Sequence, residues 1–202
     1  MLMINGSPHK EGSTFTALTE IAERLSGQGI DSEIFHIGTG PVRGCIACHK
    51  CRELGKCQFD DDCANEISQK IASSDGLVIG SPVYYSGPNG ALLSLLDRVF
   101  FSTPNPAFAL KPAAAVVVCR RGGSTAAFDR LNKYFGISSM YTVGSRYWNI
   151  LRGMTPEMVK EDAEGLAIMR KLADNIAYIL KCFELSKGKV EPAAEAPFGP
   201  AR

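Results

Sequence analysis

Four cysteines in a short stretch of the chain are the residues best suited to chemistry. Cys45, Cys48 and Cys51 each stand three positions apart, and Cys57 follows six positions later. Thiolates spaced in this way can converge on one cluster, with the fourth returning from a short loop. Clustered thiols in a reducing compartment indicate a metal site before a disulfide framework. We therefore predict that these four cysteines are metal ligands.

The spacing leaves other interpretations open. Four thiolates also suit a structural zinc ion, although closely spaced triplets are less usual for zinc. Without a metal, the cysteines would be reactive thiols or packed apolar residues. Cys63 lies just beyond the motif and could take the place of Cys57. Cys119 and Cys182 fall in an expected strand and an expected helix, so we predict that they are core residues.

A loop of small and hydroxyl residues, Gly6–Thr14, joins the first expected strand to a helix. Its backbone N–H groups would lie at the positive end of the helix dipole, which attracts anions. The hydroxyls of Ser7, Ser13 and Thr14 could donate further hydrogen bonds, and His9 could add another. The glycine spacing matches neither the dinucleotide fingerprint nor the P-loop. An ordinary strand-to-helix turn capped by Ser13 or Thr14 fits the loop equally well.

Two further loops follow the third and fourth expected strands. The first, Gly80–Gly90, has two prolines and three glycines, and its Tyr84 and Tyr85 could stack on a planar ring. The second, Cys119–Ser124, has adjacent glycines that permit a close backbone approach and two arginines that could face an anion. Both could instead be turns with packed tyrosines and solvated arginines.

These loops belong to an alternation of strands and helices. Apolar runs predict five strands, at residues 1–5, 32–37, 76–80, 112–119 and 139–143. Apolar residues at helical spacing predict helices at residues 13–26, 65–72, 89–101, 124–135 and 155–183. This alternation is typical of a doubly wound parallel α/β sheet, which binds ligands beyond the carboxyl ends of its strands. We predict one domain over residues 1–184, with a cysteine-rich insertion at about 38–62 and a disordered tail at 185–202.

Composition narrows the class of protein. The chain has 202 residues, 45% of them hydrophobic, and a net charge of +1, which suits one soluble domain. Without basic runs, a nucleic-acid partner is not expected. Apolar runs are too short to span a bilayer, and the N-terminus lacks a signal-peptide pattern. We therefore expect a cytoplasmic protein with no membrane partner.

The first two loops together resemble motifs of a known family. Gly6–Thr14 and Gly80–Arg98 are similar to the corresponding loops of the NADPH-dependent FMN reductase-like branch of the flavodoxin superfamily, and the likeness extends over about residues 1–183. The cysteine spacing resembles the motif of iron–sulfur flavoproteins in that superfamily. One departure is His9, where many relatives have Arg, because a neutral His pairs less strongly with phosphate.

The resemblance implies a flavodoxin-like three-layer α/β fold with a five-stranded parallel sheet and bound FMN. A homodimer or homotetramer with FMN at a subunit interface is implied as well. The residues expected around the FMN phosphate are Ser7, His9, Ser13 and Thr14. Those expected along the ring and ribityl chain are Pro82, Val83, Tyr84, Tyr85 and Ser86, with Gly122 and Gly123 at the far edge of the ring. The ligands of a [4Fe–4S] cluster that passes electrons to FMN would be Cys45, Cys48, Cys51 and Cys57.

The expected function is that of an FMN-binding oxidoreductase, which transfers electrons between NAD(P)H or a ferredoxin-like redox protein and a small-molecule acceptor. Because the flavin supplies the redox chemistry, we assign no catalytic acid or base. A non-catalytic electron carrier is the alternative, and a metal-stabilised interaction domain without flavin is a third. Trp148 could cap the flavin, and Asp97 and Arg98 could form an ion pair that braces the second loop.

Overall fold

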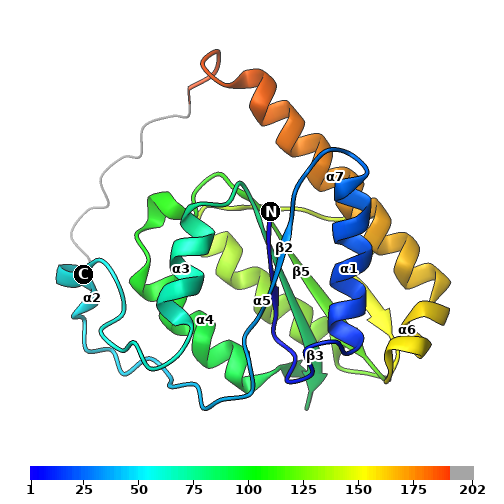
Figure 1. The fold of residues 1–202 in the computed structure, drawn as a ribbon, viewed down its shortest axis with the longest axis horizontal. Helices are drawn as coiled ribbons and strands as arrows, with labels where there is room; N and C mark the ends of the chain where they lie inside the picture. Colours follow the sequence, from blue (N-terminus) through cyan, green and yellow to red (C-terminus); the bar gives the residue numbers. More distant parts are fainter. Residues whose placement is uncertain (192–202) are drawn as a thin grey trace.

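The computed structural model describes residues 1–191 as a sheet between two layers of helices (Figure 1). The sheet order is β2-β1-β3-β5-β6, and these five strands pair in parallel. Their bounds are β1 Leu2–Asn5, β2 Glu33–His36, β3 Leu77–Tyr84, β5 Pro112–Cys119 and β6 Tyr141–Thr142. The predicted parallel sheet of five strands is confirmed, and two further short strands, described below, extend it.

The helices cover both faces of the sheet. One face packs against α1 (Ser13–Ser26), α6 (Pro156–Glu161) and α7 (Ala163–Ser186), and the other against α3 (Ala64–Ala72), α4 (Gly90–Ser102) and α5 (Ser124–Ile137). Alternate residues of β5 divide between the two cores. Ala115 and Val117 face α4 and α5, whereas Val116 faces α1 and α7. All eight residues of β5 are buried, as expected of a central parallel strand.

The third strand is longer than predicted. β3 continues past Gly80 to Tyr84 and turns back into β4 (Gly87–Pro88), so the first half of the expected loop is a β-hairpin. Tyr85 and Ser86 form its two-residue turn, with φ angles of 49° and 61°. Positive φ at both central residues is the geometry of the type I′ turn, which matches the twist of the flanking strands.

Two elements near the C-terminus differ from the prediction. The fifth strand, expected at residues 139–143, keeps only the two residues of β6, and β7 (Ile150–Arg152) pairs with the later part of β5 on the same side. The helix expected at residues 155–183 is divided at Asp162 into α6 and α7. The carboxylate of Asp162 accepts hydrogen bonds from the Gly165 N–H at 2.9 Å and from the Arg152 N–H at 2.7 Å. It therefore caps α7 and attaches it to β7.

The remaining short elements are α2 (Cys51–Leu54) within the cysteine segment and a 3₁₀ turn at Asn105–Ala107. Among residues 1–191, the helices are either too short or too polar to cross a membrane. Most of the predicted disordered tail, residues 185–202, lies outside the described residues. Its first two residues are helical, because α7 extends to Ser186.

Replacing Asp162 with Ala should destabilise the protein. The substitution removes the helix cap and the link to β7, and the loss of an N-cap costs about 0.5–2 kcal/mol. Urea denaturation followed by circular dichroism measures the free energy of unfolding. Asp162→Asn keeps an oxygen for the Gly165 N–H and should lose less. Equal stabilities for the wild type and Asp162→Ala would contradict this role of the carboxylate.

Candidate functional site

The first loop is folded around the buried side chain of Asn5, the last residue of β1. The Asn5 amide donates to the Lys10 carbonyl at 3.0 Å and accepts from the Ser7 N–H at 3.1 Å. The Ser7 hydroxyl in turn accepts from the His9 N–H at 3.1 Å, and His36 contacts the Ser7 carbonyl at 2.8 Å. The loop is therefore fixed by side chains of β1 and β2 and by its own Ser7.

Helix α1 begins without a side-chain cap. Its N-cap residue is Gly12, so the prediction that Ser13 or Thr14 is the cap is wrong, and no side chain of the described residues caps the helix in its place. N–H groups in the first turn of a helix have no partners within the helix. The Thr14 hydroxyl is also buried without a hydrogen-bond partner among residues 1–191. Several donors at the start of α1 are thus available to a ligand.

Asn89 joins the first loop to the second. Its side chain donates to the Gly6 carbonyl at 2.8 Å and accepts from the Ala91 N–H at 2.9 Å, capping α4. Its own N–H donates to the Ser81 hydroxyl at 3.0 Å, and the Gly6 N–H donates to the Gly80 carbonyl at 2.9 Å. The carboxyl ends of β1 and β3 are held side by side by these bonds.

The two loops enclose a cavity of about 720 Å³ at the carboxyl ends of the strands. The structure brings seven of the predicted residues to this cavity: Ser7, His9, Ser13, Thr14, Pro82, Val83 and Tyr84. It does not bring Tyr85, Ser86, Gly122 or Gly123 into the lining. Tyr85 is fully exposed at the tip of the hairpin. A side chain at Gly123, where φ is +84°, would clash with Ser86, so the third loop packs against the hairpin turn.

The cavity also has lining residues that were not assigned from the sequence. They are Pro8, Lys10, Glu11, Gly12, Val118, Arg120, Gly153, Met154, Thr155 and Pro156. Arg120 stands in the third loop, where the arginines suggested an anion site. Nothing in the sequence indicated that residues 153–156, between β7 and α6, line the cavity, because their position depends on the pairing of β7 with β5. Trp148 lines a neighbouring pocket with Arg152 and Asp162 instead.

The four cysteines of the motif line a second, small cavity. Cys45 and Cys48 are exposed, Cys51 begins α2, and Cys57 is buried. Phe101 and Ser102, at the end of α4, complete the wall together with His49. Among residues 1–191, no three His, Cys, Asp or Glu side chains are grouped closely enough to hold a metal ion. The thiols therefore share a cavity without converging on one point.

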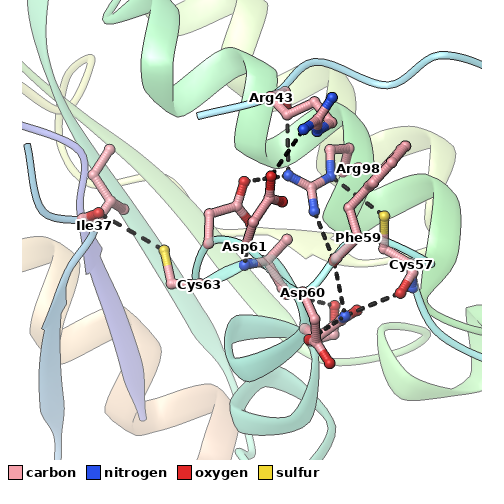
Figure 2. A network of polar contacts seen from close by, with 12 residues as sticks. Ile37, Arg43, Cys57, Phe59, Asp60, Asp61, Cys63 and Arg98 are labelled. Carbon is pink, nitrogen blue, oxygen red and sulfur yellow. Dashed lines mark hydrogen bonds and ion pairs between the residues drawn. The ribbon is translucent and has the colours of Figure 1, made fainter. Parts of the chain in front are cut away.

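Cys63 is separate from this cavity. Its thiol points to the Ile37 carbonyl, at a sulfur-to-oxygen distance of 3.7 Å (Figure 2). Burial raises the pKa of the Cys63 thiol above its ordinary value, and the nearby Asp62 carboxylate adds to this shift. The structure thus favours Cys57 over Cys63 as the fourth member of the group.

Hydrogen-bond donors contact two of the four sulfur atoms in the cysteine cavity. The Gln58 amide donates to Cys48 Sγ at 3.0 Å, and Arg98 Nε donates to Cys57 Sγ at 3.3 Å. The Ser102 hydroxyl is buried in the same wall without a hydrogen-bond partner in the described part of the chain. The cavity is therefore lined by thiols, by the apolar side chains of Ile46, Phe59 and Phe101, and by a few hydrogen-bond donors that suit a sulfur-containing or anionic group.

The predicted pairing of Asp97 with Arg98 is wrong. Asp97 accepts from Arg130 at 3.3 Å and from the Tyr134 hydroxyl, both on α5. Arg98 points to the opposite side of α4 and forms a buried ion pair with Asp62. Arg98 therefore braces the cysteine segment rather than the second loop.

Residues 1–154 match the sequence profile of the NADPH-dependent FMN reductase family. The chain belongs to this family. An iron–sulfur flavoprotein of Methanocaldococcus jannaschii is 32% identical over 188 residues, which cover 88% of this chain and 95% of the relative. An iron–sulfur flavoprotein of Methanosarcina thermophila is 28% identical over 189 residues, covering 92% and 97%.

Solved structures support the fold. Flavodoxin from Megasphaera elsdenii superposes with a TM-score of 0.57 at 14% identity, over 88% of this chain and 99% of the flavodoxin. The predicted flavodoxin-like architecture is confirmed by this likeness. Membership of the FMN reductase family makes the protein an FMN-dependent oxidoreductase.

Proposed function

We propose that FMN binds in the cavity of about 720 Å³, with its phosphate at the start of α1. The observation that carries this proposal is the buried Thr14 hydroxyl, which has no partner within residues 1–191 and lies beside the uncapped first turn of α1. A phosphate would accept hydrogen bonds from that hydroxyl and from the N–H groups of the turn. Ser7, His9 and Ser13 line the same part of the wall.

The hairpin would position the flavin ring. Pro82, Val83 and Tyr84 face the cavity, and the backbone of this segment is fixed by pairing with β4. Tyr85 and Ser86 form the adjoining turn, and Gly123 of the third loop packs against Ser86. We propose that Gly122, next to Gly123 in this loop, also lies near the far edge of the ring. Bound FMN supplies the electron-transfer chemistry. The chain would bind it, orient it and exclude water from one side of the ring.

Replacing Thr14 with Val should weaken FMN binding about tenfold or more. The substitution is nearly isosteric and removes one hydrogen bond to a charged phosphate, a loss of roughly 1.5 kcal/mol or more. Quenching of FMN fluorescence measures the dissociation constant. Thr19→Val is the matched control, because the Thr19 hydroxyl bonds only the Phe15 carbonyl of the same helix. Equal affinities for the two variants would refute the phosphate site.

The cysteine cavity is proposed to hold a [4Fe–4S] cluster. A single zinc ion would bind all four thiolates at a zinc-to-sulfur distance of about 2.3 Å, which brings the sulfurs close together. In a cluster of four irons, each thiolate binds a different iron, so the sulfurs lie farther apart. All four thiols line one cavity, and relatives that are 32% and 28% identical are named iron–sulfur flavoproteins, which supports a cluster over zinc. The Ser102 hydroxyl and the N–H groups directed at the sulfur atoms of Cys48 and Cys57 suit the negative charge of a thiolate-ligated cluster.

Replacing Cys48 with Ala should lower the iron content after anaerobic reconstitution and weaken the broad visible absorbance. Cys63→Ala is the control and should keep the iron content of the wild type, because Cys63 does not line the cavity. FMN affinity should be unchanged in both variants. Iron loss in Cys63→Ala but not in Cys48→Ala would show that the ligands are assigned wrongly.

With both groups in place, the protein would transfer electrons between NAD(P)H or a ferredoxin-like redox protein and a small-molecule acceptor. The proposed assembly is a homodimer or homotetramer, in which a second copy would cover exposed side chains such as those of Tyr85, Trp148 and Met154. None of the seven cysteines, all of which lie within residues 1–191, is paired in a disulfide, and this suits the reducing cytoplasm.

Steady-state oxidation of NADH and NADPH by the FMN-loaded protein tests catalysis against a carrier role. We expect turnover with a soluble acceptor such as a quinone. The loss of absorbance of the reduced nicotinamide measures this turnover. Protein denatured by heat is the control for uncatalysed oxidation by free FMN. No turnover with either nicotinamide, together with rapid reduction by a ferredoxin, would instead support the carrier.

A further inference from the structure

Arg98 is buried between α4 and the cysteine segment, with only 1% of the residue exposed. All three nitrogens of its guanidinium group are hydrogen-bonded (Figure 2). Nε donates to Cys57 Sγ at 3.3 Å, and Nη2 donates to the Phe59 carbonyl at 3.0 Å. Nη1 donates to the Arg43 carbonyl at 3.3 Å and to the Asp62 carboxylate. A single side chain of α4 thus bonds four residues of the cysteine segment, namely Arg43, Cys57, Phe59 and Asp62.

Cys57 is held on both sides. Its backbone N–H donates to the Asn65 side chain at 3.0 Å, and its carbonyl accepts from the same side chain at 3.0 Å. Arg98 then approaches the sulfur. Cys45 and Cys48, by contrast, are exposed to solvent. Of the four thiols that line the cavity, Cys57 is therefore the one whose sulfur lies beside a buried positive charge.

Asp62 opposes that charge. Its side chain is 7% exposed, and its second oxygen accepts from the Ala64 N–H at 3.0 Å, at the start of α3. The Arg98 cation thus lies next to the Cys57 sulfur, and the Asp62 anion lies on the other side of the guanidinium group, farther from that sulfur. Ser102, four residues after Arg98 and so on the same face of α4, adds the unpartnered hydroxyl of the cavity wall.

We infer that Arg98, balanced by Asp62, positions Cys57 and sets the reduction potential of the centre that the four cysteines hold. The inference rests on the proposed [4Fe–4S] cluster. A nearby cation and an N–H bond to a ligand sulfur both stabilise the state with the extra electron, because that state is the more negative one. Their low-dielectric surroundings strengthen the effect.

Two variants should shift the potential in opposite directions. Asp62→Asn removes the anion and keeps an oxygen for the Ala64 N–H, so the midpoint potential should rise. Arg98→Met combined with Asp62→Asn removes both charges and the bond to Cys57 Sγ, so the potential should fall below that of the wild type. The double variant avoids the unpaired buried carboxylate that Arg98→Met alone would leave.

The measurement is an anaerobic titration of the reconstituted protein with dithionite, which donates one electron to take the cluster from the 2+ to the 1+ state. Electron paramagnetic resonance follows the reduced form, and iron content and FMN affinity are determined on the same samples. Arg130→Met is the matched control. It removes an arginine from the ion pair with Asp97 on α4, away from the cysteines, and should leave the potential unchanged.

Each outcome decides the inference. Opposite shifts, or loss of iron from the double variant with FMN affinity retained, support it. Unchanged potentials, shifts of the same sign, or a shift in Arg130→Met equal to that of the double variant overturn it. Loss of both FMN and iron from the double variant also overturns it, because Arg98 would then support the whole fold. A wild-type protein that takes up no iron refutes the proposed cluster itself, and the inference with it.

Discussion

The buried amide of Asn89 joins the two loops that form the cofactor cavity. It bonds the Gly6 carbonyl and the Ala91 N–H, while its own N–H bonds Ser81. With the backbone bond from Gly6 to Gly80, these contacts keep the ends of β1 and β3 adjacent. A buried polar group without a partner loses more free energy than one hydrogen bond contributes on balance, so separating the loops would be strongly unfavourable. The cavity therefore has its shape before any ligand enters.

Asn89 is also the N-cap of α4, and this helix connects the cofactor cavity to the cysteine cavity. Asn89 caps the helix at the cofactor cavity, and Arg98 and Ser102 lie near its far end at the cysteine cavity. At 1.5 Å per residue, the nine positions from Asn89 to Arg98 span about 14 Å. Leu92, Leu95, Leu96 and Val99 anchor the helix in the core. The two cavities are thus placed at a fixed separation by one rigid element.

The sequence analysis succeeded where the signal is local. The bounds of α1 and β5 were predicted to the residue, because apolar spacing and a continuous buried run depend on near neighbours. The failures at Arg98 and at the last helix involved distant contacts. A buried arginine such as Arg98 looks like an ordinary surface charge on a helix until Asp62, 36 residues away, is placed beside it. The division of the last helix at Asp162 depends on a bond to β7, a strand too short to be seen in the pattern.

For the candidate site residues, too, the prediction succeeded in a continuous local segment and missed residues that distant pairing brings in. The residues of the first loop reached the cavity because they belong to one continuous turn between β1 and α1. Gly122 and Gly123 did not, and Gly123 instead approaches Ser86 in the hairpin turn. The residues 153–156 were missed because only the pairing of β7 with β5 brings them to the cavity.

Anaerobic reconstitution of the wild-type protein with FMN, ferrous iron and sulfide tests the central claim most directly, since it asks whether both cavities are filled as proposed. Chemical analysis after gel filtration should find about one FMN, four irons and four sulfides per chain, with a paramagnetic signal after reduction. FMN without iron would contradict the cluster. A colourless protein that retains neither would contradict the whole account.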